Sequence, residues 1–355
     1  MKKIVFTGGG SAGHVTPNLA LMDVFLKENW EIHYIGTKDG IEKELISKIK
    51  EIKYHEISAG KLRRYISKEN LKDPFKVLKG VLEAKKIIRD LKPDVIFSKG
   101  GFVSVPVVMG AWFNRIPAVI HECDYTPGLA NKIAIPFAKK ICVTFPDTLK
   151  YIKGKKGVFT GTPIRKELFL GKKEEGLKIC GFNSNKPIIM VVGGSLGAGS
   201  VNVAIRNIVK QLTTKYQIIH LCGRDKIDKN LDKVDGYKQY EYLNEELPHV
   251  LSAADLVISR AGANSIFELL SLNKPNILIP LPLSSSRGDQ ILNAKYFETQ
   301  GFSKVLMQEE VNDSTLLESI NYVYDNREGF IENMKKGSSK NSVKEIVDII
   351  KSVSK

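Results

Sequence analysis

Two glycine-rich segments and one histidine have the residue types and spacing that could do chemistry. Residues 8–14 read Gly-Gly-Gly-Ser-Ala-Gly-His, and residues 193–198 read Gly-Gly-Ser-Leu-Gly-Ala. Each segment follows a short run of apolar residues typical of strands, at 4–6 and 188–192. Each is therefore predicted to be a loop after a buried strand, with backbone N–H groups that can approach a phosphate. Two such loops suggest two anionic partners held in one cleft.

His14 directly follows the first loop, at the predicted start of a helix. A helix N-terminus disfavours the imidazolium form, so His14 is expected to be neutral near pH 7 and able to accept a proton from a substrate. A general base needs this placement. The alternative is that His14 only packs or forms a local hydrogen bond.

The first loop also fits a dinucleotide-binding pattern, because Gly8, Gly10 and Gly13 satisfy G-x-G-x-x-G between a strand and a helix. Such a site needs an acidic residue near the end of the next strand to hold the ribose. That strand ends at Thr37, and Asp39 lies beyond it in the loop. The pattern therefore favours an anion-binding loop, with a purely structural turn as the other alternative.

The second loop fits G-x-S-x-G, the nucleophile elbow of α/β hydrolases, with Ser195 at its centre. A catalytic triad would need a later acid and histidine. Only His220 and His249 follow, and neither comes after a plausible acid at the end of a core strand. Ser195 is better interpreted as a hydrogen-bond donor to phosphate.

A third glycine turn, at residues 260–268, leads from a predicted strand into a helix. The first N–H groups of this helix would form another anion site, and Glu268 could accept hydrogen bonds from a ribose. Glu268 could equally be a partner of the helix dipole. Arg165, Gln290 and Asn293 are further polar candidates for the same site, although each alone could be a solvated surface residue.

Strands and helices alternate along the chain to position these residues. Strands are predicted at 4–7, 31–35, 95–98 and 118–121, and helices begin at Thr16-Pro17 and Asp73-Pro74. The pattern restarts at 157–159 and continues with strands at 188–192, 217–221, 256–259 and 276–279. This alternation predicts parallel, doubly wound sheets, and 355 residues suit two domains. A last amphipathic helix, in which Ser342 and Glu345 have capping-box spacing, must dock on another element.

Composition limits the class of protein. The hydrophobic content of 43% supports packed cores, and no run approaches the roughly 20 apolar residues that cross a bilayer. No signal-peptide core follows Met1, which favours a cytosolic protein. The cysteines have no paired spacing, so they are expected to be reduced, and no metal site or cofactor is predicted; they are Cys123, Cys142, Cys180 and Cys222.

The net charge of +15 favours nucleic acid, an anionic membrane or phosphorylated small molecules as partners. Residues 61–86 form a local basic segment. A nucleic-acid binder would be expected to interleave aromatic residues with this segment, and Tyr65 and Phe75 are thin support.

Taken together, the motifs resemble the MurG family of bacterial N-acetylglucosaminyltransferases, over nearly the whole chain. Single glycine loops are weak signals, but this ordered series is specific. The resemblance rests on residues 8–14, 100–104, 121–122, 128–132, 161–165, 193–198 and 260–268, with Gln290 and Asn293.

The resemblance implies an α/β fold with two Rossmann-like doubly wound domains facing across a cleft, the glycosyltransferase B type. We expect an acceptor and membrane-side domain at 1–158, with the helix at 342–355 docked back on it, and a UDP-sugar-binding domain at 159–341. The implied reaction moves N-acetylglucosamine from UDP-N-acetylglucosamine to the C4 hydroxyl of undecaprenyl-pyrophosphoryl-N-acetylmuramyl-pentapeptide, with inversion. Competing hypotheses are another sugar-nucleotide transferase of this fold and a non-catalytic binding protein.

By this resemblance His14 is the catalytic base, and helix dipoles replace a metal at the departing diphosphate. Leu243 would offer backbone contacts to uracil, Glu268 would hold the ribose and Gln290 would bind the sugar. The full set implied to bind the sugar nucleotide is Ser11, Ala12, Gly13, Asp124, Arg165, Ser195, Leu243, Ala263, Asn264, Ser265, Ile266, Phe267, Glu268 and Gln290.

This chain departs from the family where Asp124 replaces a frequent Asn and Asp289 replaces a frequent Gln. A carboxylate accepts hydrogen bonds but does not donate them as an amide does, so hydrogen bonds donated there by an Asn or Gln would have to be replaced. A lipid-linked acceptor places the enzyme peripherally at the cytoplasmic face of an anionic membrane, where Lys76, Lys79 and Trp112 could make contact. The alternative is that the apolar residues belong to the core and the lysines to a solvated face.

Overall fold

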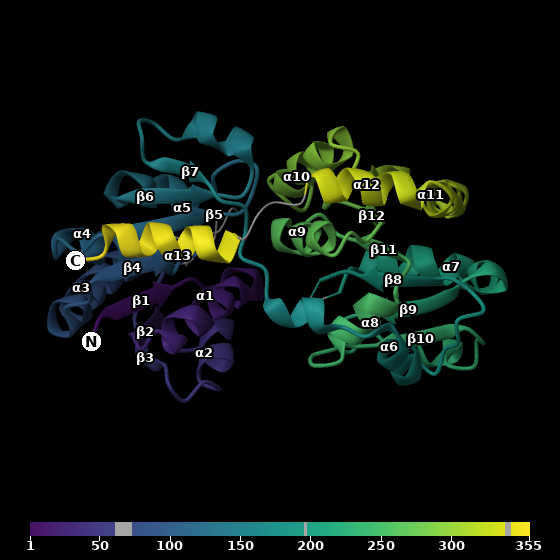
Figure 1. Ribbon diagram of the computed structural model, residues 1–355, viewed down its shortest axis with the longest axis horizontal. Helices are drawn as coiled ribbons and strands as arrows, with labels where there is room; N and C mark the ends of the chain where they lie inside the picture. Colours follow the sequence, from purple (N-terminus) through teal and green to yellow (C-terminus); the bar gives the residue numbers. More distant parts are fainter. Residues whose placement is uncertain (61–72, 195–196, 338–341) are drawn as a thin grey trace. The chain divides into compact units, whose positions relative to one another are not determined.

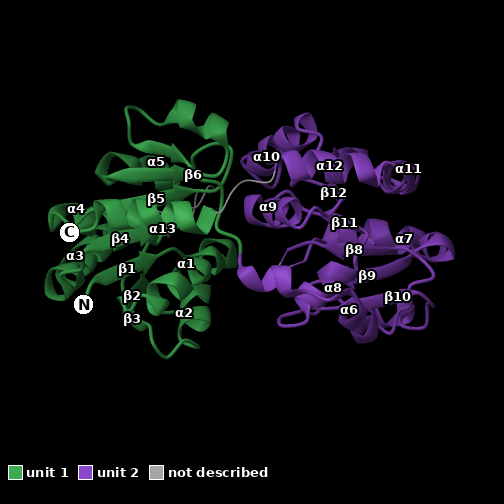
Figure 2. Ribbon diagram, viewed as in Figure 1, with its two compact units in different colours: residues 1–164, 340–355 green, residues 165–339 purple. Residues whose placement is uncertain are grey.

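The computed structural model describes residues 1–60, 73–194, 197–337 and 342–355. The chain forms two compact units (Figure 2). Unit 1 comprises Met1–Ile164 together with Lys340–Lys355, and unit 2 comprises Arg165–Ser339. The last helix of the chain therefore belongs with the first unit.

Unit 1 is built on a seven-stranded parallel sheet of order β3-β2-β1-β4-β5-β6-β7 (Figure 1). Its strands are β1 (Lys3–Thr7), β2 (Glu31–Gly36), β3 (Lys53–Glu56), β4 (Val95–Ser98), β5 (Ala118–Glu122), β6 (Lys140–Val143) and β7 (Gly157–Phe159). Its helices are η1 (Ala12–His14), α1 (Thr16–Lys27), α2 (Ile41–Ile46), α3 (Asp73–Leu91), α4 (Ser104–Phe113), α5 (Leu129–Ala134), η3 (Ile135–Phe137), η4 (Pro146–Tyr151) and α13 (Ser342–Val353).

Helices cover both faces of this sheet, because successive strand residues point to opposite sides. On one side, Ile4 and Phe6 pack in a core with α1 and α13. On the other side, Val5 packs in a second core with α3 and α4. α13 contributes Ile346, Val347 and Ile350 to the first of these cores, all nearly inaccessible to solvent.

Unit 2 repeats the plan with a six-stranded parallel sheet of order β10-β9-β8-β11-β12-β13. Its strands are β8 (Ile188–Val192), β9 (Gln217–Leu221), β10 (Tyr237–Tyr240), β11 (Leu256–Ser259), β12 (Asn276–Leu278) and β13 (Lys304–Val305). Its helices are η5 (Lys166–Leu170), α6 (Lys173–Cys180), α7 (Gly199–Lys215), η6 (Lys229–Leu231), α8 (Leu247–Ala253), α9 (Ala263–Ser271), α10 (Asp289–Thr299), η7 (Gln308–Glu310), α11 (Asp313–Asp325) and α12 (Arg327–Gly337).

Each glycine-rich loop follows the strand at which the order of its sheet reverses. β1 lies between β2 and β4, and β8 lies between β9 and β11. In open parallel sheets, ligands bind outside the carboxyl ends of the strands at this switch point. The predicted doubly wound fold is confirmed in both units, and the topology gives each unit one binding position at its own loop.

One strand belongs to a different unit from the one we predicted. Residues 157–159 were expected to open the second α/β pattern, but β7 pairs with β6 at the edge of the first sheet. Without β7, the outer edge of β6 would be unpaired. The strand at 157–159 therefore belongs to unit 1 because of its pairing with β6, although it precedes the second half of the chain directly. The strands β3, β6, β10 and β13 had no clear signal in the sequence, since they are short or partly polar.

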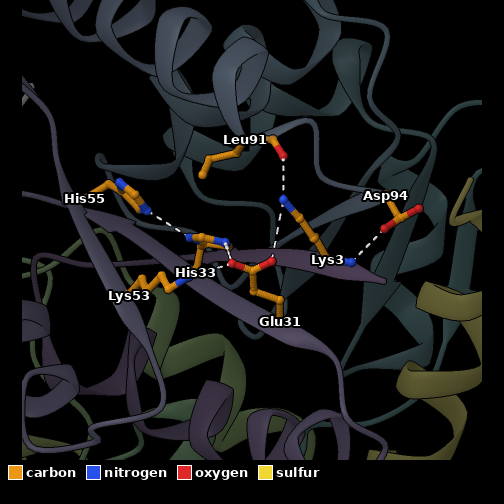
Figure 3. A network of polar contacts seen from close by, with 7 residues as sticks. All are labelled: Lys3, Glu31, His33, Lys53, His55, Leu91 and Asp94. Carbon is orange, nitrogen blue, oxygen red and sulfur yellow. Dashed lines mark hydrogen bonds and ion pairs between the residues drawn. The ribbon is translucent and has the colours of Figure 1, made fainter. Parts of the chain in front are cut away.

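A polar network lies at the amino ends of the first strands of unit 1 (Figure 3). Glu31 lies 2.7 Å from Lys53 Nζ, 3.5 Å from Lys3 Nζ and 3.2 Å from His33 Nε2. His33 Nδ1 and His55 Nε2 lie 2.9 Å apart. These residues are at the end of the sheet opposite to the first glycine loop.

Candidate functional site

His14 lies beyond the carboxyl end of β1, in the connection to α1. The short helix η1 carries it, and Val15 caps α1 immediately afterwards. The Nδ1 atom lies 2.8 Å from Ser11 Oγ. A Cβ atom built on Gly100 would lie 3.5 Å from Cδ2 of the imidazole. The ring is therefore hydrogen-bonded along one edge and lies close to the glycine turn after β4 along the other.

The contact with Ser11 bears on which nitrogen of His14 could act as a base. A neutral imidazole has one N–H and one lone pair on its two nitrogens. When Nδ1–H donates to Ser11 Oγ, the lone pair is on Nε2. The arrangement can then support proton abstraction by Nε2.

A hydrogen-bonded loop follows β5, in the segment that contains Asp124. The buried Glu122 carboxylate accepts hydrogen bonds from the backbone N–H groups of Asp124 and Gly128, both at 2.9 Å, and from Asn131 Nδ2 at 2.8 Å. Burial and the neighbouring Asp124 raise the pKa of Glu122 to about 7. Asn131 Oδ1 is buried and has no hydrogen-bond partner among the described residues. It would lie 3.4 Å from a Cβ on Gly100, the same glycine that His14 approaches.

Glu122, Cys123 and Asp124 bring potential metal-ligand atoms within 4.8 Å of one another. Both oxygens of Glu122 already accept N–H donors. Burial raises the pKa of the Cys123 thiol to about 12, which disfavours the thiolate that binds metals. The three residues therefore suit an ordered loop better than a metal centre.

Two buried charged residues of unit 1 had not been predicted as part of the site. Lys99, at the end of β4, is fully buried, and its Nζ lies 2.9 Å from His121 Nδ1. His121 Nε2 lies 2.8 Å from the Gly161 carbonyl and donates to it, so Nδ1 can accept from Lys99. Burial, and to a smaller extent the charge of the nearby Lys99, holds the pKa of His121 well below its usual range. Glu42 of α2 is also fully buried and contacts the first glycine loop.

Only weak signals in the sequence could have identified Lys99 and Glu42. Lys99 follows an apolar strand directly, and Glu42 lies at the start of a helix. Lysine and glutamate in such positions are usually solvated. Their burial depends on neighbours that come from distant parts of the chain.

In unit 2, Arg165 and Glu268 form an ion pair, with Nη2 and Oε1 3.5 Å apart. Arg165 precedes η5, and Glu268 lies in the second turn of α9. Burial raises the pKa of Glu268, although Arg165 opposes this shift. The two predicted residues therefore lie together, at the helix that follows β11.

α9 begins directly after the glycine turn, with Gly262 as its N-cap. The Ile266 N–H already donates to the Gly262 carbonyl. The N–H groups of residues 263–265 precede this first bond of the helix, so they are the ones that α9 can direct toward an anion. The side chains of Ile266 and Phe267 are buried, and Phe267 packs edge-on against Phe297.

Polar side chains of α10 support the backbone around this turn. Asn293 Nδ2 donates to the Ala261 carbonyl at 3.2 Å, and the Leu281 N–H donates to Gln290 Oε1 at 3.1 Å. Asp289 lies 3.0 Å from Arg287 Nε. Leu243 is buried after β10. Ser195 lies outside the described residues.

The predicted membrane-side residues lie on α3 and α4, which pack against each other (Figure 1). Lys76 and Lys79 are exposed on α3 beside Phe75, which is 74% exposed. Trp112 on α4 is 53% exposed. The basic residues between 61 and 72 lie outside the described part of the chain. No helix among the described residues has both the length and the apolar character to cross a membrane.

Comparison with protein families gives two matches in chain order. Residues 4–143 match the glycosyltransferase family 28 N-terminal domain, and residues 188–350 match the glycosyltransferase family 28 C-terminal domain.

Curated relatives match along nearly their whole length. A protein of Clostridium tetani is 59% identical over 349 residues, covering 98% of this chain and 97% of its own. A protein of Clostridium botulinum strain Langeland is 57% identical over 355 residues, covering 100% of both chains. Both are named UDP-N-acetylglucosamine--N-acetylmuramyl-(pentapeptide) pyrophosphoryl-undecaprenol N-acetylglucosamine transferase.

Solved structures share the fold. Acinetobacter baumannii MurG is 25% identical with a TM-score of 0.78, covering 99% of this chain and 100% of its own. The calicheamicin glycosyltransferase CalG4 has a TM-score of 0.74 at 11% identity, covering 99% and 98%, which indicates a shared fold alone.

Proposed function

Because this chain belongs to glycosyltransferase family 28, and within it to the MurG transferases, we propose that it moves N-acetylglucosamine from UDP-N-acetylglucosamine to undecaprenyl-pyrophosphoryl-N-acetylmuramyl-pentapeptide (lipid I). The muramyl C4 hydroxyl attacks the anomeric carbon, the bond from this carbon to the diphosphate breaks, and UDP leaves. The new β-1,4 link gives lipid II, a precursor of peptidoglycan.

The observation that supports this mechanism best is the setting of His14. Its Nδ1 lies at hydrogen-bond distance from Ser11, and the ring lies close to the glycine turn after β4. In the proposed reaction Nε2 removes the proton of the C4 hydroxyl as that oxygen attacks. General-base catalysis is usually worth about 10² to 10⁴ in rate.

We assign acceptor binding to unit 1. Asn131 Oδ1, near the same glycine as His14, is a buried acceptor that a sugar hydroxyl could satisfy. By the resemblance, Ser11, Ala12, Gly13 and Asp124 also contact the sugar donor. The Asp124 carboxylate would accept hydrogen bonds from sugar hydroxyls.

We assign UDP binding to unit 2. The diphosphate gains negative charge as the sugar leaves, and the N-terminus of α9 would stabilise this charge, together with Arg165 and Ser195. Glu268 would exchange its ion pair with Arg165 for the ribose hydroxyls. Leu243 would contact uracil through its backbone, and Gln290 would bind the transferred sugar.

The exposed face of α3 and α4 is our proposed membrane contact, at the cytoplasmic leaflet. Its apolar residues are Phe75, Leu78, Leu82, Trp112 and Phe113, all about half exposed or more. Lys76 and Lys79 lie among them, and Lys85 Nζ lies 5.4 Å from the centre of the Phe113 ring. Aromatic residues insert at the lipid interface, and each lysine near an anionic leaflet contributes roughly 1 kcal/mol.

The deciding experiment is turnover of UDP-N-acetylglucosamine with a short-chain lipid I analogue, comparing wild type with His14→Ala. We expect UDP release to require the muramyl acceptor and to fall by about 10² to 10⁴ in the variant. UDP release without acceptor would reject the substrate. Full turnover by His14→Ala would reject the base.

A further inference from the structure

A buried carboxylate contacts the first glycine loop. Glu42, the second residue of α2, has no solvent exposure. Its Oε2 accepts a hydrogen bond from the Gly10 N–H at 3.3 Å. Its Oε1 accepts from the Thr37 N–H at 3.0 Å and from Thr37 Oγ1 at 2.5 Å. Among the described residues no cation forms an ion pair with it, so neutral donors stabilise the carboxylate.

The loop passes between Glu42 and the turn after β4. A Cβ atom built on Gly9 would lie 2.7 Å from Glu42 Cδ, so only glycine allows this approach. On the other side, a Cβ atom on Gly101 would collide with the Gly9 carbonyl. Residues 9 and 10 are thus fixed from both sides, and Glu42 is the side chain that holds them from the side of α2.

The position of this part of the loop determines where the backbone of His14 lies. Tyr34 Oη donates to the Gly8 carbonyl at 2.5 Å, and a Cβ atom on Gly8 would collide with the His14 carbonyl. The chain therefore folds back on itself between residues 8 and 14. A shift of Gly10 would move Ser11, which is next in the chain and is the hydrogen-bond partner of the His14 ring.

The same geometry argues against a phosphate at Gly10. A glycine loop after a first strand commonly binds phosphate through its backbone N–H groups. Here the Gly10 N–H already donates to the Glu42 carboxylate, and the negative charge of this group would repel a second anion.

We propose that Glu42 is a positioning residue of the transfer reaction, which holds the first glycine loop so that Ser11 and His14 are in place. This inference rests on the proposed role of His14 as the base. Glu42 touches no substrate in this proposal and acts only through the loop.

The test compares Glu42→Gln with a matched control on the same helix, Glu44→Gln. The amide keeps the size of Glu42 and one acceptor oxygen, but its NH2 group cannot accept from the Gly10 N–H. Glu44 is exposed and lies 3.9 Å from Lys48. We expect Glu42→Gln to lower kcat, measured with saturating donor and acceptor, about 10- to 100-fold, within the range of general-base catalysis. Glu44→Gln should match wild type.

A double variant separates positioning from a general loss of structure. If Glu42 acts through His14, adding Glu42→Gln to His14→Ala should lower kcat by less than about twofold, because the effects of residues that act as a unit are not additive. Losses that multiply, or a Glu42→Gln variant within about threefold of wild type, would overturn the proposal. If His14→Ala alone keeps full activity, the proposed base fails first, and the role of Glu42 fails with it.

Melting temperature and UDP binding check that each variant is folded. Should Glu42→Gln fail this check, Glu42→Asp replaces it, since the shorter side chain keeps the charge but withdraws from Gly10. The same kcat loss and the same result in the His14→Ala background are expected, and the same outcomes would reject the proposal.

Discussion

At the scale of single residues, the Ser11 hydroxyl is the feature that orients the proposed base, with Oγ 2.8 Å from Nδ1 of His14. A hydroxyl can accept from Nδ1–H or donate to an unprotonated Nδ1, so this contact holds the ring in either tautomer. We expect Ser11→Ala to lower kcat by about tenfold or more, because the ring then loses this hydrogen bond and Nε2 is less often in place. Steady-state kinetics with saturating donor and acceptor measure this loss.

Ser11→Thr is the matched control, because it keeps the hydroxyl and should retain most of the activity. Ser11 is exposed, so neither variant should alter the melting temperature by more than a degree or two. Equal kcat values for Ser11→Ala and wild type would show that the hydroxyl does not orient the ring.

The sequence alone indicated His14, Arg165 and Glu268 as candidate site residues, because each lies beside a glycine turn that follows a strand, and these turns can be recognised locally. It did not predict Glu42 or Lys99. Glu42 becomes buried because β1, β2 and α2 bring Gly10 and Thr37 to it. Lys99 becomes buried because β5 supplies His121 as its partner. Such roles depend on pairing between distant segments, for which no local pattern exists.

At the scale of elements, the exposed face of α3 predicts binding to anionic membranes. We expect the double variant Lys76→Glu/Lys79→Glu to bind vesicles rich in phosphatidylglycerol about tenfold more weakly or worse, since two attractive charges become repulsive. Co-sedimentation with these vesicles and with neutral phosphatidylcholine vesicles measures the effect.

The matched control reverses two exposed lysines of unit 2, in Lys210→Glu/Lys229→Glu, and should bind almost as wild type does. Binding that is independent of anionic lipid, or an equal loss in both double variants, would reject the α3 face as the contact.

The histidine pair on β2 and β3 predicts a loss of stability in mild acid. Burial, before any other cause, lowers the pKa of both His33 and His55 from 6.5. Above pH 6.5 both histidines are neutral in the folded and in the unfolded protein, and their contribution to stability is complete. This contribution is lost as the pH falls toward their pKa values in the folded protein. Protonation of both would also bring two cations together near Lys53, with Glu31 as the facing anion.

His55→Gln should therefore show a smaller loss of melting temperature than wild type between pH 7.5 and 5.5. The hydrogen bond with Lys53, opposed by burial, lowers the pKa of Glu31 to about 2, so Glu31 adds no slope in this range. The comparison isolates the pair from other buried histidines. An equal or steeper loss in the variant would contradict the assignment.

Prediction of elements succeeded where strands are long and apolar and failed where they are short. β8 is apolar throughout, β1 and β9 are mostly apolar, and all three were predicted nearly to their bounds. β3 reads Lys-Tyr-His-Glu and lies at the edge of its sheet, where polar residues are tolerated. β7 has three residues, and only its pairing with β6 assigns it to unit 1.

At the scale of the whole molecule, the two units repeat one topology with different contents at the switch point. In unit 1 a histidine and a buried carboxylate contact the glycine loop. In unit 2 the strand beside β8 leads into the N-terminus of α9, and this helix carries the glutamate that pairs with an arginine. This contrast supports the assignment of proton transfer to unit 1 and of diphosphate binding to unit 2.

The docking of α13 on unit 1 gives a prediction for stability. Ile350 is fully buried in the core formed with α1 and the first strands. Ile350→Ala should destabilise unit 1 by about 2–5 kcal/mol, the usual effect of truncating a buried isoleucine. Trp30 and Trp112 are the only tryptophans of the chain and both belong to unit 1, so their fluorescence in urea follows this unit alone.

Asp348→Ala, on the exposed face of the same helix, is the control and should change the free energy of unfolding by less than about 1 kcal/mol. If Ile350→Ala unfolds at the same urea concentration as this control, α13 contributes no stability to unit 1.

The return of the chain to unit 1 also sets the order in which the protein can be completed during synthesis. Domains generally fold as they leave the ribosome, with the N-terminal one first. Here unit 1 begins at Met1 but receives α13 only after all of unit 2 has been made. The α13-binding side of the core of unit 1 is therefore uncovered until synthesis ends. A ribosome that stalls before residue 342 leaves unit 1 incomplete although unit 2 is nearly complete.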